Sequence, residues 1–222
     1  MKYLISICLV LFSWGTLYSQ SLAGGVNPDS NPAVLPDSSV SDTTTHRAKP
    51  KLLPGDISWM ERFLWGEDGL VRKVGIAGPL TPETRKGELQ VRRTMLTAHQ
   101  IGGFVTLGLL VGAVYFGQRT LDGGDRTIKN DHVMFVTAAV ISYSLTGGLA
   151  ILSPPPLIRR SETSTTTIHK TLAWVHFVGM VVTPILGSMI GRRYPNDTSR
   201  IHQISGYITT STLALSMIVV TL

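Results

Sequence analysis

Four segments of this 222-residue chain are apolar over a length that crosses the hydrocarbon core of a bilayer, about twenty residues as an α-helix. They cover residues 95–117, 132–152, 171–190 and 201–222, and none contains Asp, Glu, Lys or Arg. Backbone polar groups in lipid must be satisfied within the segment, which favours helices. Glycines recur in all four segments and predict close helix packing. The sequence therefore predicts an all-α protein with a four-helix transmembrane bundle in residues 95–222.

The N-terminal part of the chain predicts an exported tether. Residues 1–20 combine Lys2, an apolar run and small residues, the pattern of a signal peptide, with an uncleaved anchor as the alternative. The only cysteine, Cys8, lies inside this run, so a mature chain has no disulfide and no thiolate metal site. Residues 21–53 are rich in Ser, Thr, Pro and Asp and predict a disordered linker.

Residues 54–94 predict a juxtamembrane amphipathic segment. Trp59, Met60, Phe63 and Leu64 lie at one-turn spacings, which indicates a short helix at the membrane–water interface or one packed on the next element. Thr81 before a proline is a typical helix start, and that helix is expected to continue into the first span.

The orientation follows from the expected signal peptide, because basic residues flank the spans on both sides. Export of residues 21–94 places the loops 119–131 and 191–200 in the cytoplasm. The protein is then expected in the inner (plasma) membrane, with its N-terminal segment exported.

Four of the six histidines are expected to lie near the ends of the spans. His99 and His176 fall near the exported ends of the first and third spans, and His132 and His202 near the cytoplasmic ends of the second and fourth. A polar side chain in a membrane helix is a functional candidate, although a lone interfacial histidine is often only a hydrogen-bonded surface residue. The arrangement of all four in two leaflet pairs favours a shared function.

Two neutral imidazoles that face each other across a bundle suit the axial positions of a haem iron. A zinc or copper site needs three or four ligands, and no Cys, Asp or Glu joins either pair. Without a Cys-x-x-Cys-His motif the haem is of b type. We therefore expect His99 with His176 to bind an outer haem and His132 with His202 an inner haem. His169 is an alternative outer ligand, and a supporting or propionate contact is the expected role for it.

Glycines follow the histidines by one turn. They are Gly103 after His99, Gly179 after His176 and Gly206 after His202. Such glycines leave room for a flat macrocycle, or they serve ordinary helix packing. The stretch "HQIGGF" from His99 resembles "HQISGY" from His202, and this repeat predicts one haem-ligand helix per haem.

Residues 95–222 resemble the transmembrane cytochrome b561 and ferric reductase superfamily. The residues that carry the resemblance are His176, Gly179, Pro184, Gly187 and the basic-aromatic end Arg192–Tyr194 in the third span, and His202, Gly206 and Tyr207 in the fourth. The resemblance implies two b haems that carry electrons across the membrane. It implies no particular donor or acceptor, because no ascorbate-binding stretch is present.

The function expected from the sequence is transmembrane electron transfer through two haem b groups with bis-histidine ligation. The alternatives are a haem-free membrane anchor or scaffold subunit and a quinol-linked or ferric reductase subunit, so enzymatic activity is left open. The expected partners are the membrane and a redox donor and acceptor, a quinone or a soluble carrier. No nucleic acid is expected, and the oligomeric state is left open.

Overall fold

The computed structural model of the chain describes residues 52–158, 164–190 and 195–221, with the side chains of residues 195–196 left out. The expected signal peptide and nearly all of the expected linker lie outside these residues. Within the described ranges every regular element is an α-helix.

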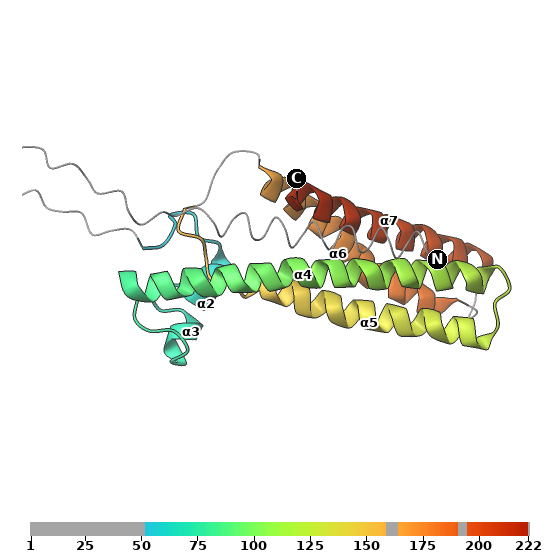
Figure 1. The fold of residues 1–222 in the computed structure, drawn as a ribbon, viewed down its shortest axis with the longest axis horizontal. Helices are drawn as coiled ribbons and strands as arrows, with labels where there is room; N and C mark the ends of the chain where they lie inside the picture. Colours follow the sequence, from blue (N-terminus) through green and yellow to red (C-terminus); the bar gives the residue numbers. More distant parts are fainter. Residues whose placement is uncertain (1–51, 159–163, 191–194, 222) are drawn as a thin grey trace, which may run out of the picture. The chain divides into compact units, whose positions relative to one another are not determined.

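Four long helices make up most of the described chain (Figure 1). They are α4 (Pro82–Leu121), α5 (Arg126–Ile151), α6 (Thr165–Met189) and α7 (Pro195–Thr221). Each has a segment that is long and apolar enough to cross a membrane, with a mean hydropathy between 1.5 and 1.7. The predicted all-α transmembrane bundle is confirmed, and the fold is that of an integral membrane protein.

The first long helix continues without a break from the polar segment into the first span, as predicted. Thr81 caps it, since the Thr81 hydroxyl accepts a hydrogen bond from the Thr84 amide at 3.2 Å, and Pro82 occupies the first turn. The helix has 40 residues, so it is about 60 Å long and extends well beyond the bilayer core.

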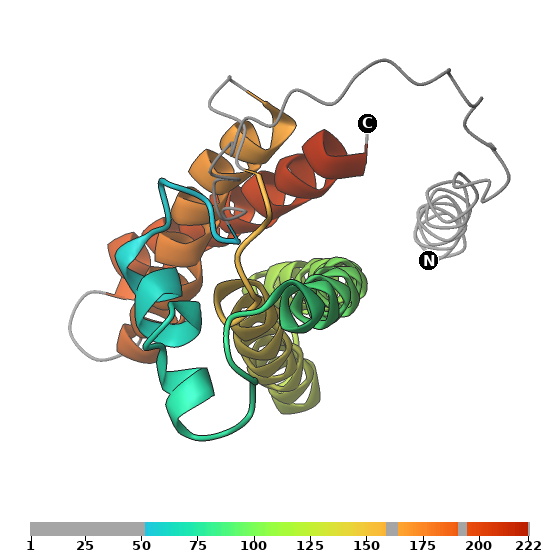
Figure 2. The same ribbon diagram turned by 90° about the vertical axis from the view of Figure 1, so that its left-hand side faces the viewer.

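The long helices form two hairpins. Helix α4 packs along α5, and α6 packs along α7, while α4 and α7 make the main backbone contact between the hairpins. Figure 2 shows the two pairs separately, with α4 beside α5 and α6 beside α7. Gly123, with a φ of 90°, makes the turn between α4 and α5.

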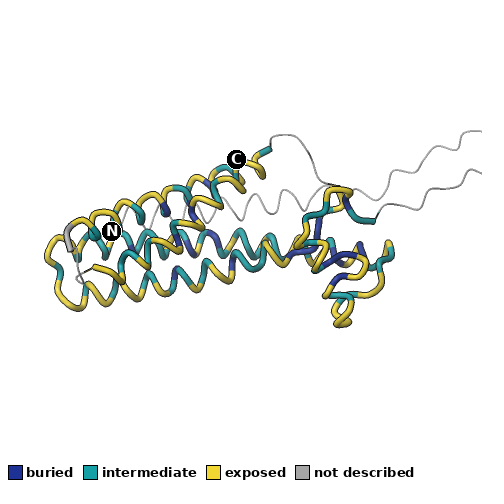
Figure 3. Tube along the Cα trace, turned by 180° about the vertical axis from the view of Figure 1, so that it is seen from behind, coloured by how far each residue is buried: buried dark blue, intermediate teal, exposed yellow. Residues whose placement is uncertain are grey.

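Few side chains of the bundle are buried (Figure 3). The buried apolar side chains of α4–α7 are Ala113, Ala139, Met180, Leu213 and Met217, whereas Trp174 is 70 % exposed and Leu145 68 %. This inversion of the usual soluble pattern is expected where lipid covers the outer surface of a protein.

Two short helices precede the bundle. Helix α2 (Trp59–Trp65) begins with a capping box, in which Ser58 and Glu61 each bond the other's backbone amide. Helix α3 (Leu70–Lys73) follows. Trp65 is buried, and its indole N–H donates to the Leu152 carbonyl at the end of α5. Helix α2 therefore packs on the neighbouring element with one face, and its interfacial position remains a prediction.

A buried ionic cluster connects this segment to α4. The Glu88 carboxylate pairs with Arg72 at 2.6 Å and with Arg85 at 2.5 Å. Arg85 also donates to the carbonyls of Leu52 and Pro155. Because all three charged side chains are 6 % exposed or less, the cluster is a fixed connection and not a mobile surface ion pair.

Candidate functional site

Two pairs of histidine rings join the hairpins. The rings of His99 on α4 and His169 on α6 lie 6.1 Å apart between centroids, at an interplanar angle of 88°. The rings of His132 on α5 and His202 on α7 are also 6.1 Å apart, at 87°. Each hairpin thus contributes one ring to each pair.

A backbone carbonyl holds Nδ1 of each of these four rings. The Nδ1 atom of His99 lies 2.8 Å from the carbonyl oxygen of Thr146. The Nδ1 atoms of His132 and His202 lie 2.8 Å and 2.9 Å from the carbonyl oxygens of Ala113 and Thr183, respectively. In His169 it lies 3.2 Å from the Ser216 carbonyl and 2.7 Å from the Ser216 hydroxyl.

These contacts determine the tautomer of three rings. In His99, His132 and His202 the partner of Nδ1 is a carbonyl oxygen, which only accepts, so Nδ1 carries the proton in a neutral ring and the lone pair is on Nε2. In His169 the Ser216 hydroxyl can also donate to Nδ1, so either tautomer satisfies the contact. No described residue forms a hydrogen bond with Nε2 of His99, His132, His169 or His202. The Nε2 lone pairs of His99, His132 and His202 are therefore available, and this is the state in which imidazole binds a metal.

The two hairpins repeat each other at a spacing of seventy positions. The bonded groups are 47 residues apart both in His99–Thr146 and in His169–Ser216. They are 19 apart both in Ala113–His132 and in Thr183–His202. Adding seventy to the numbers of these four residues of the first hairpin gives their four counterparts in the second.

The same spacing gives the separation of the two pairs along the bundle. On α4, fourteen residues separate His99 from Ala113, whose carbonyl holds His132. On α6, fourteen residues separate His169 from Thr183, whose carbonyl holds His202. At 1.5 Å per residue the two ring pairs are about 21 Å apart along the helix axes.

The sequence paired His99 with His176, whereas the structure places the His169 ring beside His99; which of the two is a ligand stays a prediction. The sequence prediction started the third span at residue 171 and left His169 at its edge. Helix α6 begins at Thr165, so His169 is already one turn inside the helix. The predicted pairing of His132 with His202 agrees with the observed ring contact.

His176 lies instead against Tyr143 of α5. Its Nδ1 is 2.9 Å from the phenol oxygen, and the ring centroids are 5.5 Å apart. The side chain is 6 % exposed, and Nε2 is buried without a hydrogen-bond partner among the described residues.

The predicted glycines pack against helix α7 or α6 rather than beside the paired rings. A Cβ on Gly103 would lie 2.8 Å from the Met217 sulfur, and one on Gly179 would collide with the Thr209 hydroxyl. A Cβ on Gly206 would lie 3.7 Å from the Thr183 methyl group, an ordinary contact. None of these three contacts involves a histidine of the two pairs.

Two other glycines, seventy positions apart, lie against the rings. A Cβ on Gly117 would be 3.0 Å from the His132 ring, and one on Gly187 would be 2.9 Å from the His202 ring. Only Gly187 was noted in the sequence, as part of the resemblance. The signal that would have found both is the spacing itself, since thirty-three residues separate His99 from His132 and also His169 from His202.

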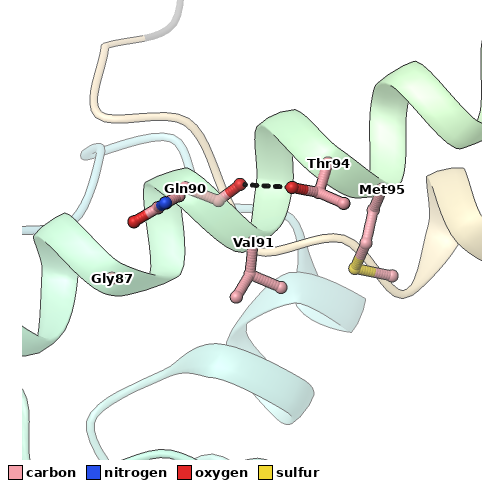
Figure 4. Close-up of a pocket in the computed structure, with 5 residues that line it drawn as sticks. All are labelled: Gly87, Gln90, Val91, Thr94 and Met95. Carbon is pink, nitrogen blue, oxygen red and sulfur yellow. Dashed lines mark hydrogen bonds between the residues drawn. The ribbon is translucent and has the colours of Figure 1, made fainter.

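Two surface hollows of the described structure lie along the N-terminal part of α4. One of about 510 Å³ is lined by Gly87, Gln90, Val91, Thr94 and Met95 of α4 alone (Figure 4). Another, of about 540 Å³, lies near Leu52, Arg85, Arg93 and Leu157. Among the described residues no group of three or more His, Cys, Asp or Glu side chains is arranged to hold a metal ion.

No family model, curated protein or solved structure matches this chain in the three comparisons. The fold and the site define an integral membrane protein with two facing pairs of histidines between two helical hairpins.

Proposed function

We propose that this protein transfers electrons across a membrane through two b-type haems, one held by His99 and His169 and the other by His132 and His202. The observation that carries the proposal is the repeated geometry of the two ring pairs. Both have the same centroid distance, 6.1 Å, and all four rings have Nδ1 on a carbonyl.

The ring spacing fits a single metal ion between each pair. Metal–imidazole bonds of about 2 Å on both sides place the two ring centroids roughly 6 Å apart. Edge-to-face ring pairs commonly have centroids about 4.5–7 Å apart without an ion, so the support comes from finding the same distance in both pairs, with all four Nε2 atoms unbonded among the described residues. Each pair supplies two ligands, the number that a porphyrin iron still requires.

The described residues favour haem over a bare metal ion. Zinc and copper sites are completed by a third or fourth protein ligand, and no such cluster occurs among the residues that the structure describes. Two-ligand pairs in an otherwise apolar bundle suit a cofactor that brings its own equatorial nitrogens.

The chain's contribution is to orient and separate the ligands. The bonds from Nδ1 orient the rings and make Nε2 a stronger metal ligand. Haem, when bound, supplies one-electron redox chemistry. The axial separation of about 21 Å between the ring pairs places the two sites near opposite faces of a core roughly 30 Å thick.

The direction of the bundle follows from the N-terminal sequence. With residues 1–20 as a signal peptide, His99 and His169 lie towards the exported side of the inner (plasma) membrane, and His132 and His202 towards the cytoplasm. The redox partners are then a donor and an acceptor on opposite sides, a quinone or a soluble carrier.

Haem analysis of the purified full-length protein tests the proposal. After expression with ample haem, pyridine haemochrome analysis is expected to find two b haems per chain, with a low-spin reduced spectrum. Protein that folds and stays colourless under these conditions contradicts the proposal.

A further inference from the structure

Two polar side chains, His176 and Tyr143, depart from the seventy-residue repeat at a level midway between the two histidine pairs. Thr106 of α4 corresponds to His176 of α6, and Leu213 of α7 corresponds to Tyr143 of α5. The exchange places an imidazole and a phenol on adjacent helices of different hairpins, where they form a hydrogen bond of 2.9 Å. The carbonyl groups that bond the four paired histidines all follow the seventy-residue spacing. The His176–Tyr143 pair does not, so we assign it a purpose other than orienting those histidines.

His176 lies halfway between the two histidine pairs. It follows His169 by seven residues and precedes Thr183, which holds His202, by seven. Along the helix axis it is therefore about 10 Å from each pair. Three titratable side chains of the described spans interact with His176. They are Tyr143 on α5, His99 on α4 and His169 on α6.

Nε2 of His176 is buried and has no partner among the described residues. Burial of a polar nitrogen without a hydrogen bond is unfavourable, and such atoms in native proteins usually mark a bound water, ion or functional group. In the tautomer in which Nδ1–H donates to the Tyr143 oxygen, Nε2 offers a lone pair in the centre of the bundle.

Hydroxyl groups lie between this level and the inner histidine pair. Thr183 lies 2.6 Å from Ser205 and 3.4 Å from Thr209, oxygen to oxygen. Thr209 in turn packs against Gly179, which is one turn from His176. Such groups both donate and accept hydrogen bonds, so they suit proton movement in an otherwise apolar interior.

We propose that His176, held by Tyr143, binds a proton when the flanking redox sites are reduced. The inference rests on the proposed function. One electron from an external reductant cancels one positive charge about 10 Å from His176, and a proton from the aqueous phase then binds to Nε2 and forms the imidazolium. At this distance the loss of one charge strengthens proton binding roughly tenfold in a protein interior.

Redox titration of the full-length protein in detergent, with dithionite as reductant, tests this proposal from about pH 3.5 to pH 8. The midpoint potential of at least one site is expected to fall as the pH rises. Tenfold coupling corresponds to a total change of about 59 mV. The variant His176→Gln, which keeps a polar side chain but does not titrate there, is expected to bind both haems and to lose this pH dependence.

Two further variants make the result decisive. Thr106→Val changes the counterpart position of His176 and is expected to keep the wild-type pH dependence. Tyr143→Phe keeps the imidazole and is expected to move the pH at which the potential changes. It also serves as the test if His176→Gln does not fold.

Three outcomes overturn the inference. They are potentials that do not change with pH in the wild-type protein, an unchanged pH dependence in His176→Gln, and loss of one haem in His176→Gln, which would make His176 an axial ligand. A protein without haem contradicts the proposed function instead, so the two failures are distinguishable.

Discussion

The imidazole rings of His132 and His202 lie 6.1 Å apart and nearly perpendicular, although α5 and α7 belong to different hairpins. A backbone carbonyl within its own hairpin holds each ring. The position of each ligand is thus set locally, and the pair forms only when the hairpins meet.

Single alanine variants of the four paired histidines test the assignment of ligands. His99→Ala and His169→Ala are expected to lose the same redox transition, and His132→Ala and His202→Ala the other, because a haem held without covalent bonds depends on both axial ligands. Redox potentiometry and haem content measure this. The assignment is wrong if His169→Ala keeps both transitions while His176→Ala loses the one that His99→Ala loses.

Replacing Ser216 by alanine removes one of the two hydrogen bonds to Nδ1 of His169 and keeps the carbonyl contact. Loss of a partner that orients a metal ligand typically weakens metal affinity about 10- to 100-fold, and we expect the lower end because the carbonyl remains. Haem transfer to apomyoglobin measures the loss from each site. Ser144→Ala, which removes an exposed hydroxyl bonded within its own helix, is the control and should leave both sites unchanged.

Gly187→Leu is expected to empty the inner site and spare the outer one. Its Cβ alone would lie 2.9 Å from the His202 ring, and overpacking of this kind costs about 1–3 kcal/mol and displaces the ring. Gly117→Leu, against His132, should act in the same way. The matched control is Gly108→Leu on α4, where nothing lies within 4 Å. Equal loss from both sites would indicate general misfolding instead.

Glu88→Gln tests the ionic cluster. The substitution removes the charge between Arg72 and Arg85, which are 6 % and 2 % exposed. Breaking a buried ion pair typically costs about 3–5 kcal/mol. We expect faster proteolysis between α2 and α4 and a lower melting temperature, with both haems retained. Glu83→Gln, at an exposed position in the first turn of α4, should have little effect.

Hydropathy was sufficient to predict the four spans, because lipid allows few other structures. Local signals also predicted the start of α4 at Thr81 and a helix around Trp59. The sequence paired His99 with His176, whereas the structure places the His169 ring beside His99. Hydropathy does not register the polar start of α6, so the predicted span began at residue 171, six residues after Thr165, and left His169 at its edge.

The side chains that each glycine packs against could not be predicted from its spacing to the nearest histidine. Gly103 and Gly179 contact side chains of α7, and their neighbours depend on how each helix is rotated about its axis. The buried Arg85–Glu88 pair was equally unpredictable, since charged residues outside a span normally face water. The repeat of seventy positions would have identified the ring pairs, but its few identical residues hide it.

The carbonyl bonds also bear on how the protein is made. His99 and His132 are held by groups of the α4–α5 hairpin, and His169 and His202 by groups of the α6–α7 hairpin. If the proposed function holds, the first hairpin is synthesised with its two histidines already oriented by its own carbonyl groups, before the second hairpin exists. Each haem would then bind only after the second hairpin supplies its histidine, and a chain stalled before residue 202 would lack one ligand of the His132–His202 site.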